Sequence, residues 1–159
     1  MKLIYLNSVD STNTYAKQHL HELSDHAVIV ADTQTAGRGR QNRSWLSNKP
    51  GNVYLSIILK PKHASPDELT ALTQKLAQAV IDGLRDKGVS AEMKPPNDVM
   101  VRGKKIAGIL AESTTQGSIL KGVIFGLGVN LNLSNEETQS IGQPATSLYL
   151  ETGLLVERE

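Results

Sequence analysis

The chain has 159 residues, 39% of them hydrophobic and 21% charged, which is enough for one domain with a buried core. Its 17 basic and 16 acidic residues nearly cancel, so the net charge offers no general attraction to nucleic acid or to a membrane surface. The absence of cysteine excludes disulfides, thiolate nucleophiles and cysteine-bound metals. No apolar run approaches the roughly 20 residues of a membrane-spanning helix, and the first residues do not resemble a signal peptide, so we expect a cytoplasmic location.

The first third of the chain predicts three strands and one short helix. Compact apolar runs indicate strands over residues 3–6, 27–31 and 53–59. Between the first two, Ser11 is placed to begin a helix that continues to about Leu23. The expected order of elements in this region is therefore strand, helix, strand, strand.

The next predicted element is a long amphipathic helix that begins at Pro66. Ser65 as the N-cap and Glu68 three residues later form the sequence pattern of a capping box, and proline is favoured at the first helical position. Apolar residues recur at three- and four-residue spacing before Gly88 provides a stop: Leu69, Leu72, Leu76, Val80 and Leu84. We interpret this stripe as the face that packs on the core.

The second half of the chain predicts strands joined by short turns. These strands cover about residues 89–94, 99–101, 105–112 and 119–130, with hairpin turns at 102–104 and 115–118. Short hairpin links favour antiparallel neighbours. Strands in series with two separated helices predict an α+β fold, a mixed and mainly antiparallel β-sheet flanked by helices, in one domain over residues 1–159.

A segment rich in glycine and arginine follows the second predicted strand. Residues 35–43, Thr-Ala-Gly-Arg-Gly-Arg-Gln-Asn-Arg, contain two glycines and three arginines. Glycine permits positive φ angles and lets the backbone approach a ligand closely, while arginine offers planar, permanently charged donors for phosphate or carboxylate. We call this segment the glycine-arginine loop. Alone, it fits either a mobile loop that closes over an anion or an ordinary solvated turn.

Four further polar clusters lie at predicted strand ends or turns, where functional residues concentrate. They occupy residues 10–13, 94–98, 104–105 and 126–130. Each has a plain structural explanation: a helix cap, a proline-directed turn, solvent-facing lysines, and glycines that relieve crowding between strands. Taken singly, none of these clusters requires a function.

Seven short motifs occur in one order between residue 10 and about residue 149. They are D-S-T-N at 10–13, Q-T-x-G-R-G-R at 34–40, R-x-W at 43–45, N-x-Y-x-S at 52–56, P-N-D at 96–98, K-[IL]-[AS]-G-[IV]-L at 105–110 and G-[IL]-G-[IV]-N at 126–130. Together they resemble the catalytic domain of biotin protein ligases, which share a superfamily with lipoate ligases. The resemblance implies the biotin–lipoate ligase catalytic fold, which is similar to that of class II aminoacyl-tRNA synthetases.

The resemblance implies a reaction in two steps. Biotin and MgATP form biotinyl-5′-AMP, and biotin then passes to one lysine of a biotin carboxyl carrier protein. In the first step a carboxylate attacks the α-phosphate, so two anions must be held together against their repulsion. By similarity, Lys105, Arg38 and Arg40 are the catalytic residues, because their positive charge offsets that repulsion and stabilises the developing charge. No covalent enzyme nucleophile is expected.

The same resemblance implies two groups of binding residues. Those for biotin are Ser11, Thr12, Asn13, Gln34, Gly37, Arg38, Arg40, Lys105 and Gly108. Those for the nucleotide and its magnesium are Lys94, Asn97, Asp98 and Asn130, without an assigned set of metal ligands. The loop arginines are expected to order the loop over the intermediate and to shield it from water.

Two departures from the family pattern affect these expectations. Pro95 stands where the family usually has tryptophan, which removes a large aromatic ring and a backbone donor. We also expect neither the C-terminal β-domain nor the N-terminal helix-turn-helix that longer members of the family have. DNA binding is therefore not expected, and a partly bare sheet face favours self-association, which allows a homodimer. The alternatives are a biotin-binding remnant that does not ligate and a lipoate ligase.

Overall fold

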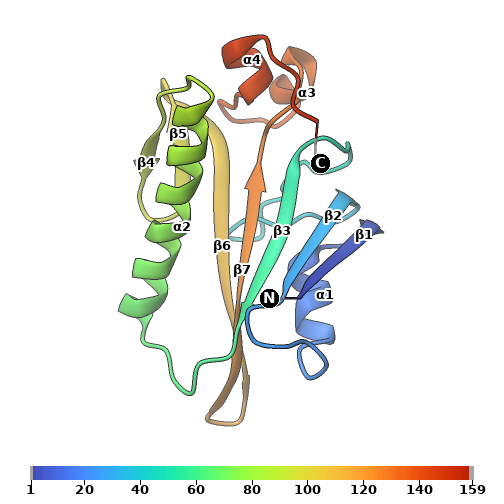
Figure 1. Cartoon of the computed structure of the whole chain (residues 1–159), viewed down its shortest axis with the longest axis vertical. Coiled ribbons are helices and arrows are strands. Elements are labelled where there is room, and N and C mark those ends of the chain that lie inside the picture. Colours follow the sequence, from blue (N-terminus) through green and yellow to red (C-terminus); the bar gives the residue numbers. More distant parts are fainter. Residues whose placement is uncertain (1, 158–159) are drawn as a thin grey trace.

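The computed structural model describes residues 2–157 and contains one seven-stranded sheet with helices on both faces (Figure 1). In spatial order the strands are β1 (Leu3–Val9), β2 (Val28–Gln34), β3 (Val53–Leu59), β7 (Ile119–Val129), β6 (Lys104–Gln116), β5 (Asp98–Val101) and β4 (Glu92–Lys94). Neighbouring strands are antiparallel except β1 and β2, which run parallel. The predicted α+β class and mixed, mainly antiparallel sheet are confirmed.

Two helices, α1 (Thr12–Gln18) and α2 (Pro66–Asp86), cover opposite faces of this sheet. Alternate residues of a strand point to opposite faces, and β7 shows the division clearly. Val123 and Phe125 pack in the core cluster that contains α2, whereas Ile124 packs in the cluster that contains α1. The sheet therefore separates two hydrophobic cores, one beneath each helix.

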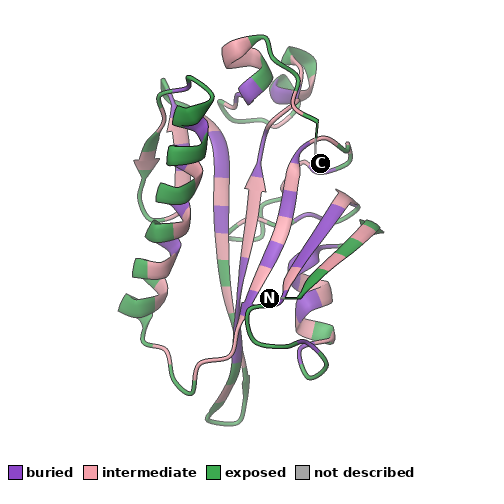
Figure 2. Ribbon diagram, in the orientation of Figure 1, coloured by how far each residue is buried: buried purple, intermediate pink, exposed green. Residues whose placement is uncertain are grey.

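The long helix α2 forms as its sequence predicts. The Ser65 hydroxyl accepts a hydrogen bond from the Glu68 backbone N–H at 3.2 Å, and the Glu68 carboxylate accepts one from the Ser65 N–H at 2.7 Å. The predicted apolar stripe packs against the core, and Ala77 and Ile81, which the predicted stripe did not include, are buried beside it. The outward side of α2 is exposed (Figure 2). Gly88, at φ 80°, follows the end of the helix.

Several element ends differ from the prediction. The first helix stops at Gln18, and the chain continues in turns that still bury Leu20 and Leu23. The second strand extends to Gln34, which places that side chain at the end of β2. Only Glu92–Lys94 of the predicted 89–94 strand pairs with a neighbour.

Two short helices near the C-terminal end were not predicted, namely α3 (Asn135–Gln139) and α4 (Leu148–Thr152). Each begins at a serine N-cap: Ser134 accepts from the N–H of residue 137 at 3.3 Å, and Ser147 from that of residue 150 at 3.2 Å. Helices of five residues are too short to show a helical apolar repeat, so the sequence pattern did not predict them. No helix within residues 2–157 is long and apolar enough to cross a membrane.

Candidate functional site

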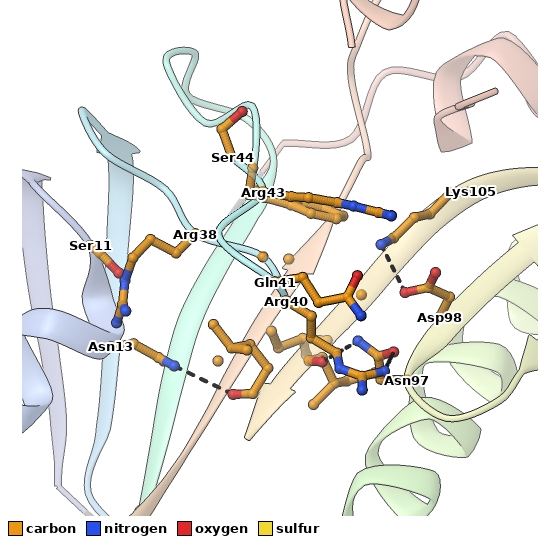
Figure 3. A pocket seen from close by; sticks show the side chains of 18 of the residues that line it. Ser11, Asn13, Arg38, Arg40, Gln41, Arg43, Ser44, Asn97, Asp98 and Lys105 are labelled. Carbon is orange, nitrogen blue, oxygen red and sulfur yellow. Dashed lines mark hydrogen bonds and ion pairs between the residues drawn. The ribbon is translucent and has the colours of Figure 1, made fainter. Parts of the chain in front are cut away.

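A cleft of about 170 Å³ opens on the sheet face that carries α1 (Figure 3). Six of the seven motifs contribute to its lining, which comprises Ser11, Thr12, Asn13, Gln34, Arg38, Gly39, Arg40, Gln41, Arg43, Ser44, Trp45, Pro96, Asn97, Asp98, Lys105, Gly108, Ile109, Leu110, Gly126, Leu127, Gly128 and Gln143. The seventh motif, at residues 52–56, lies behind the lining, where Ser56 bonds to Asn13. Clusters that are far apart in the sequence therefore meet at one place.

Glycines of β6 and β7 form the floor of the cleft. Gly108 pairs with Gly128 across the two strands, and Leu110 pairs with Gly126. A Cβ at Gly128 would lie 2.4 Å from the Trp45 ring, and one at Gly126 would lie 2.5 Å from the Asn13 side-chain oxygen. These positions therefore need glycine because another group occupies the space where a side chain would lie.

The wall next to α1 consists of buried, uncharged polar side chains. The Thr12 N–H donates to the Gln34 amide oxygen at 2.8 Å, and the Gln34 amide nitrogen donates to the Ser47 hydroxyl at 3.1 Å. The Asn13 side-chain oxygen accepts from Ser56 at 2.5 Å. Ser11 is the N-cap residue of α1, but its hydroxyl makes no capping hydrogen bond. The 10–13 cluster therefore does more than end a helix, because it presents a fixed set of neutral donors and acceptors to the cleft.

The glycine-arginine loop is a tight hairpin. Gly39 N–H donates to the Arg43 carbonyl at 2.7 Å, and Trp45 N–H donates to the Gly37 carbonyl at 2.8 Å. Positive φ angles occur at Gln41 (55°) and Asn42 (59°) at the tip, so the expectation of positive φ at the two glycines is wrong. Gly37 is instead required for close packing, since a Cβ there would lie 2.3 Å from the Ser47 hydroxyl.

The two predicted loop arginines have different partners. Arg38 donates to the Glu112 carboxylate at 2.8 Å. Arg40 instead donates to the neutral side-chain oxygen of Asn97 at 3.1 Å (Figure 3). Lys105, the third predicted catalytic cation, forms an ion pair with Asp98. Among the residues that the structure describes, Arg40 is thus the one of these three cations without an acidic partner. Its charge remains available to a ligand.

Lys105 is fixed at the opposite side of the cleft from Arg38. Its Nζ lies 2.7 Å from the Asp98 carboxylate and 5.2 Å from the centre of the Trp45 ring, which is within the range of a cation–π contact. The side chain is only 17% exposed, so the plain structural explanation of a solvent-facing lysine does not hold for this position. The arrangement holds one ammonium group at a defined point in the cleft.

Glu112 is a member of the site that the sequence analysis did not identify. Its carboxylate accepts hydrogen bonds from Asn13, Arg38 and Lys17. Burial acts to raise the pKa of Glu112, but the hydrogen bonds from Lys17 and Asn13 and the charge of Arg38 outweigh it and lower the pKa. The sequence did contain a clue to Glu112. Residue 112 continues the strand that carries the 105–110 motif, and alternation puts it on the same face as Gly108 and Leu110.

Three predicted site residues do not line the cleft. Gly37 lies behind it, and Lys94 is exposed at the end of β4. Asn130 is buried and donates to the Thr146 carbonyl at 3.1 Å. It does line a smaller neighbouring pocket, which shares Trp45 and Lys105 with the cleft.

The described residues contain no cluster of three or more histidine, cysteine, aspartate or glutamate side chains that could hold a metal ion. Asp98 is the one carboxylate in the lining of the cleft. Magnesium in nucleotide sites is commonly held by one or two carboxylates together with substrate phosphates. The donor set therefore fits a magnesium ion that arrives with a nucleotide and does not form a separate protein-bound metal centre.

The fold and the cleft define an α+β domain with a positively charged, glycine-floored ligand site. Residues 5–130 match the model of the Biotin/lipoate A/B protein ligase family, and the chain belongs to this family. The bifunctional ligase/repressor BirA of Bacillus subtilis is 36% identical over 98% of this chain and 49% of its own length. The biotin–[acetyl-CoA-carboxylase] ligase of Paracoccus denitrificans is 34% identical over 97% of this chain and 65% of its own length.

A solved structure of similar fold is the biotin protein ligase from Aquifex aeolicus in complex with biotin and ATP. It has a TM-score of 0.85 and 36% identity over 99% of this chain, which corresponds to 63% of that protein. A putative lipoate protein ligase from T. acidophilum is 12% identical with a TM-score of 0.63, so it shares the fold alone. The chain thus spans about half of the Bacillus relative and less than two thirds of the Aquifex protein.

Proposed function

We propose that residues 1–159 form the catalytic domain of a biotin–protein ligase, which activates biotin with ATP and transfers it to a lysine of a biotin carboxyl carrier protein. The observation that carries this proposal is the convergence of the family's motifs on one cleft with an excess of positive charge. Four cationic side chains line that cleft, against one carboxylate: Arg38, Arg40, Arg43 and Lys105 against Asp98. The similarity to ligases, one of them solved with biotin and ATP, supports the same reaction.

The proposed first step joins two anions. An oxygen of the biotin carboxylate forms a bond to the α-phosphorus of ATP, the bond from that phosphorus to the bridging oxygen breaks, and pyrophosphate leaves. Lys105 and Arg40 are the groups best suited to lower the repulsion, because one is fixed beside Trp45 and the other carries a charge that no acid offsets. In the second step the carrier lysine amine attacks the acyl carbon, AMP leaves, and the amine proton passes to solvent.

The α1 wall suits the uncharged end of biotin. A ureido group offers neutral donors and an acceptor, and the wall offers neutral partners from Ser11, Thr12, Asn13 and Gln34. Gly108 and the Trp45 ring supply apolar surface between this wall and Lys105. In this arrangement the carboxylate of biotin points toward the cations.

The nucleotide is proposed to lie toward Asn97 and Asp98, at the opposite side of the cleft. Asn130 would meet a nucleotide that extends into the smaller pocket beyond Lys105. Contact with Lys94 rests on the family resemblance alone, because that side chain is exposed outside the cleft. Magnesium is proposed to enter as MgATP. A cytoplasmic location and a homodimer are further parts of the proposal and rest on composition and on the family resemblance.

Titration calorimetry tests the binding part of this proposal. The chain should bind biotin, and MgATP added with biotin should yield pyrophosphate and a tightly held adenylate. Absence of binding with either addition would contradict the proposal. Lipoate added as a competitor should displace biotin poorly, and equal competition would assign the chain to the lipoate branch of the family.

Transfer of biotin to a carrier domain tests the ligation part. Pro95, at a position where the family usually has tryptophan, favours a second candidate function, namely binding of biotin without ligation. A single turnover of biotinylated carrier protein excludes that candidate. Binding of biotin and MgATP without any transfer would instead support it.

A further inference from the structure

Glu112 does not line the cleft, although two of its partners, Asn13 and Arg38, do. Its Oε2 atom accepts from the Asn13 amide nitrogen and from the Arg38 guanidinium, both at 2.8 Å. Its Oε1 atom accepts from Lys17, on the last turn of α1. One side chain of β6 therefore binds α1 twice and the glycine-arginine loop once.

The charges around Glu112 make it hard to replace. The carboxylate is 17% exposed and faces two cations, whose side chains are 33% (Lys17) and 41% (Arg38) exposed. An ionised carboxylate only accepts hydrogen bonds, so it can satisfy all three donors at once. A neutral amide would present one acceptor and one donor there, and at least one of the three donors would lose its partner.

Glu112 also fixes which way the Asn13 amide faces. The Asn13 nitrogen donates to the carboxylate at 2.8 Å and to the Leu110 carbonyl at 3.4 Å, so its oxygen points to Ser56, from which it accepts at 2.5 Å. Without the Glu112 carboxylate the longer contact with Leu110 would remain, and the opposite orientation of this amide would become more accessible. The donor and acceptor pattern of the α1 wall therefore depends on a residue outside the wall.

The same carboxylate is one of two side-chain tethers of the loop. Arg38 ties the loop to β6 through Glu112, and Arg40 ties it to the β4–β5 turn through Asn97. The first tether joins opposite charges, whereas the second joins a cation to a neutral amide. Hydrogen bonds between two charged groups are the stronger kind, so Glu112 provides the firmer attachment.

We propose that Glu112 is a positioning residue that holds the glycine-arginine loop against β6 and orients the Asn13 amide before ligand binds. It acts through Arg38 and Asn13 and does not touch the substrate. Its effect on biotin rests on the proposed function, whereas its effect on the loop does not. The gain for binding is preorganisation, because the loop and the amide are already ordered when the ligand arrives.

The test compares Glu112→Gln, Arg38→Gln and the double variant with the wild-type chain. Asp82→Asn is the matched control, since it removes the acid of an exposed ion pair with Arg85 on α2, on the other face of the sheet. Glu112→Gln should weaken biotin binding by about 5- to 30-fold in calorimetry, with the affinity calculated from the concentration of folded protein. The loss of biotin affinity in the double variant should be smaller than the sum of the two single losses, because Glu112 and Arg38 act as a unit. Any loss beyond that of Arg38→Gln alone is the part that Glu112 exerts through Asn13. The control should bind as the wild type does.

Limited trypsin digestion of the ligand-free chain provides a second readout. Cleavage after Arg40 or Arg43, located by mass spectrometry, should be faster in Glu112→Gln than in the wild type or the control. The proposal would be overturned if Glu112→Gln kept both wild-type biotin affinity and wild-type loop cleavage, even if its melting temperature fell. It would also be overturned if the losses of affinity in Glu112→Gln and Arg38→Gln added fully in the double variant. If Glu112→Gln does not fold, Glu112→Asp replaces it in both assays, because it keeps the charge. Its biotin affinity and loop cleavage should lie between those of the wild type and those expected for Glu112→Gln. If the wild type binds no biotin, the proposed function fails, but the digestion still decides the role of Glu112.

Discussion

Replacement of Gly128 by alanine should displace Trp45 from the floor of the cleft. The new Cβ would lie 2.4 Å from Cε2 and 2.5 Å from Nε1 of the indole, whereas ordinary van der Waals contact begins at 3.4 Å. The ring therefore has to retreat by about 1 Å. Because the contacted atoms belong to Trp45, which lies just after the glycine-arginine loop and not in a strand of the sheet, we expect the ring to move and the sheet to stay.

The energetic cost should be modest. Insertion of a methylene into a packed site costs about 1–3 kcal/mol, and a movable neighbour favours the lower end of that range. Lys105 lies 5.2 Å from the centre of the Trp45 ring, and loss of such a partly exposed cation–π contact costs about 0.5–1 kcal/mol more. We therefore expect Gly128→Ala to lower the free energy of unfolding by about 1.5–2 kcal/mol.

Intrinsic fluorescence measures the displacement directly, because Trp45 is the only tryptophan in the chain. Its indole nitrogen is buried without a hydrogen-bond partner, so movement should expose it, shift the emission to the red and increase quenching by acrylamide. Gly83→Ala is the matched control: no atom lies within 4 Å of its Cβ position, and the change should stabilise α2 by up to about 1 kcal/mol without affecting the emission. Wild-type emission and quenching in Gly128→Ala would refute the reasoning.

Three further changes have defined outcomes. Lys105→Ala should slow adenylate formation by about 10²–10³-fold, measured as pyrophosphate release, with a much smaller loss of biotin affinity, and equal losses would make Lys105 a binding residue only. Burial raises the pKa of Tyr54 from 10.0 to about 12, so the native state keeps a proton that the unfolded state releases, and stability falls as the pH rises from 10 to 12. Urea titrations should show that the wild type loses about 1 kcal/mol more than Tyr54→Phe between pH 10 and 11, and parallel losses would contradict this. Ser65→Ala should cost about 1 kcal/mol in the same titrations, because it removes the capping box of α2, whereas an unchanged midpoint would show that the cap is not needed.

Elements with strong local signals were predictable from the sequence. The cap at Ser65 and the apolar stripe that follows it determine α2, and the compact apolar run at 53–59 determines the bounds of β3, because these patterns act within a few residues. The parallel pairing of β1 with β2 was not predictable in this way. Strands joined through α1 need a crossover, and their pairing is decided by packing on the sheet and not by a turn.

The site also has a part that the sequence predicts and a part that it does not. Motif residues identified most of the lining, but the ion pair of Arg38 with Glu112 joins positions 74 residues apart, and no local pattern predicts it. The loop shows a different limit. Glycine is the usual residue at positive φ, yet Gln41 and Asn42 take that conformation here, while Gly37 is needed for space. Conformational preference and steric need cannot be distinguished from the letter G alone.

Strands β1 to β3 precede α2 in the chain and β4 to β7 follow it, so β3 and β7 form the one strand pairing between these groups in residues 2–157. The cleft straddles this boundary, with Gln34 and Arg38 from the first group and Lys105 and Gly128 from the second. A ligand that contacts both sides therefore acts as a non-covalent cross-link between the halves of the sheet. Amide hydrogens of β3 and β7 should exchange with solvent more slowly when it is bound, and their protection should rise with ligand concentration.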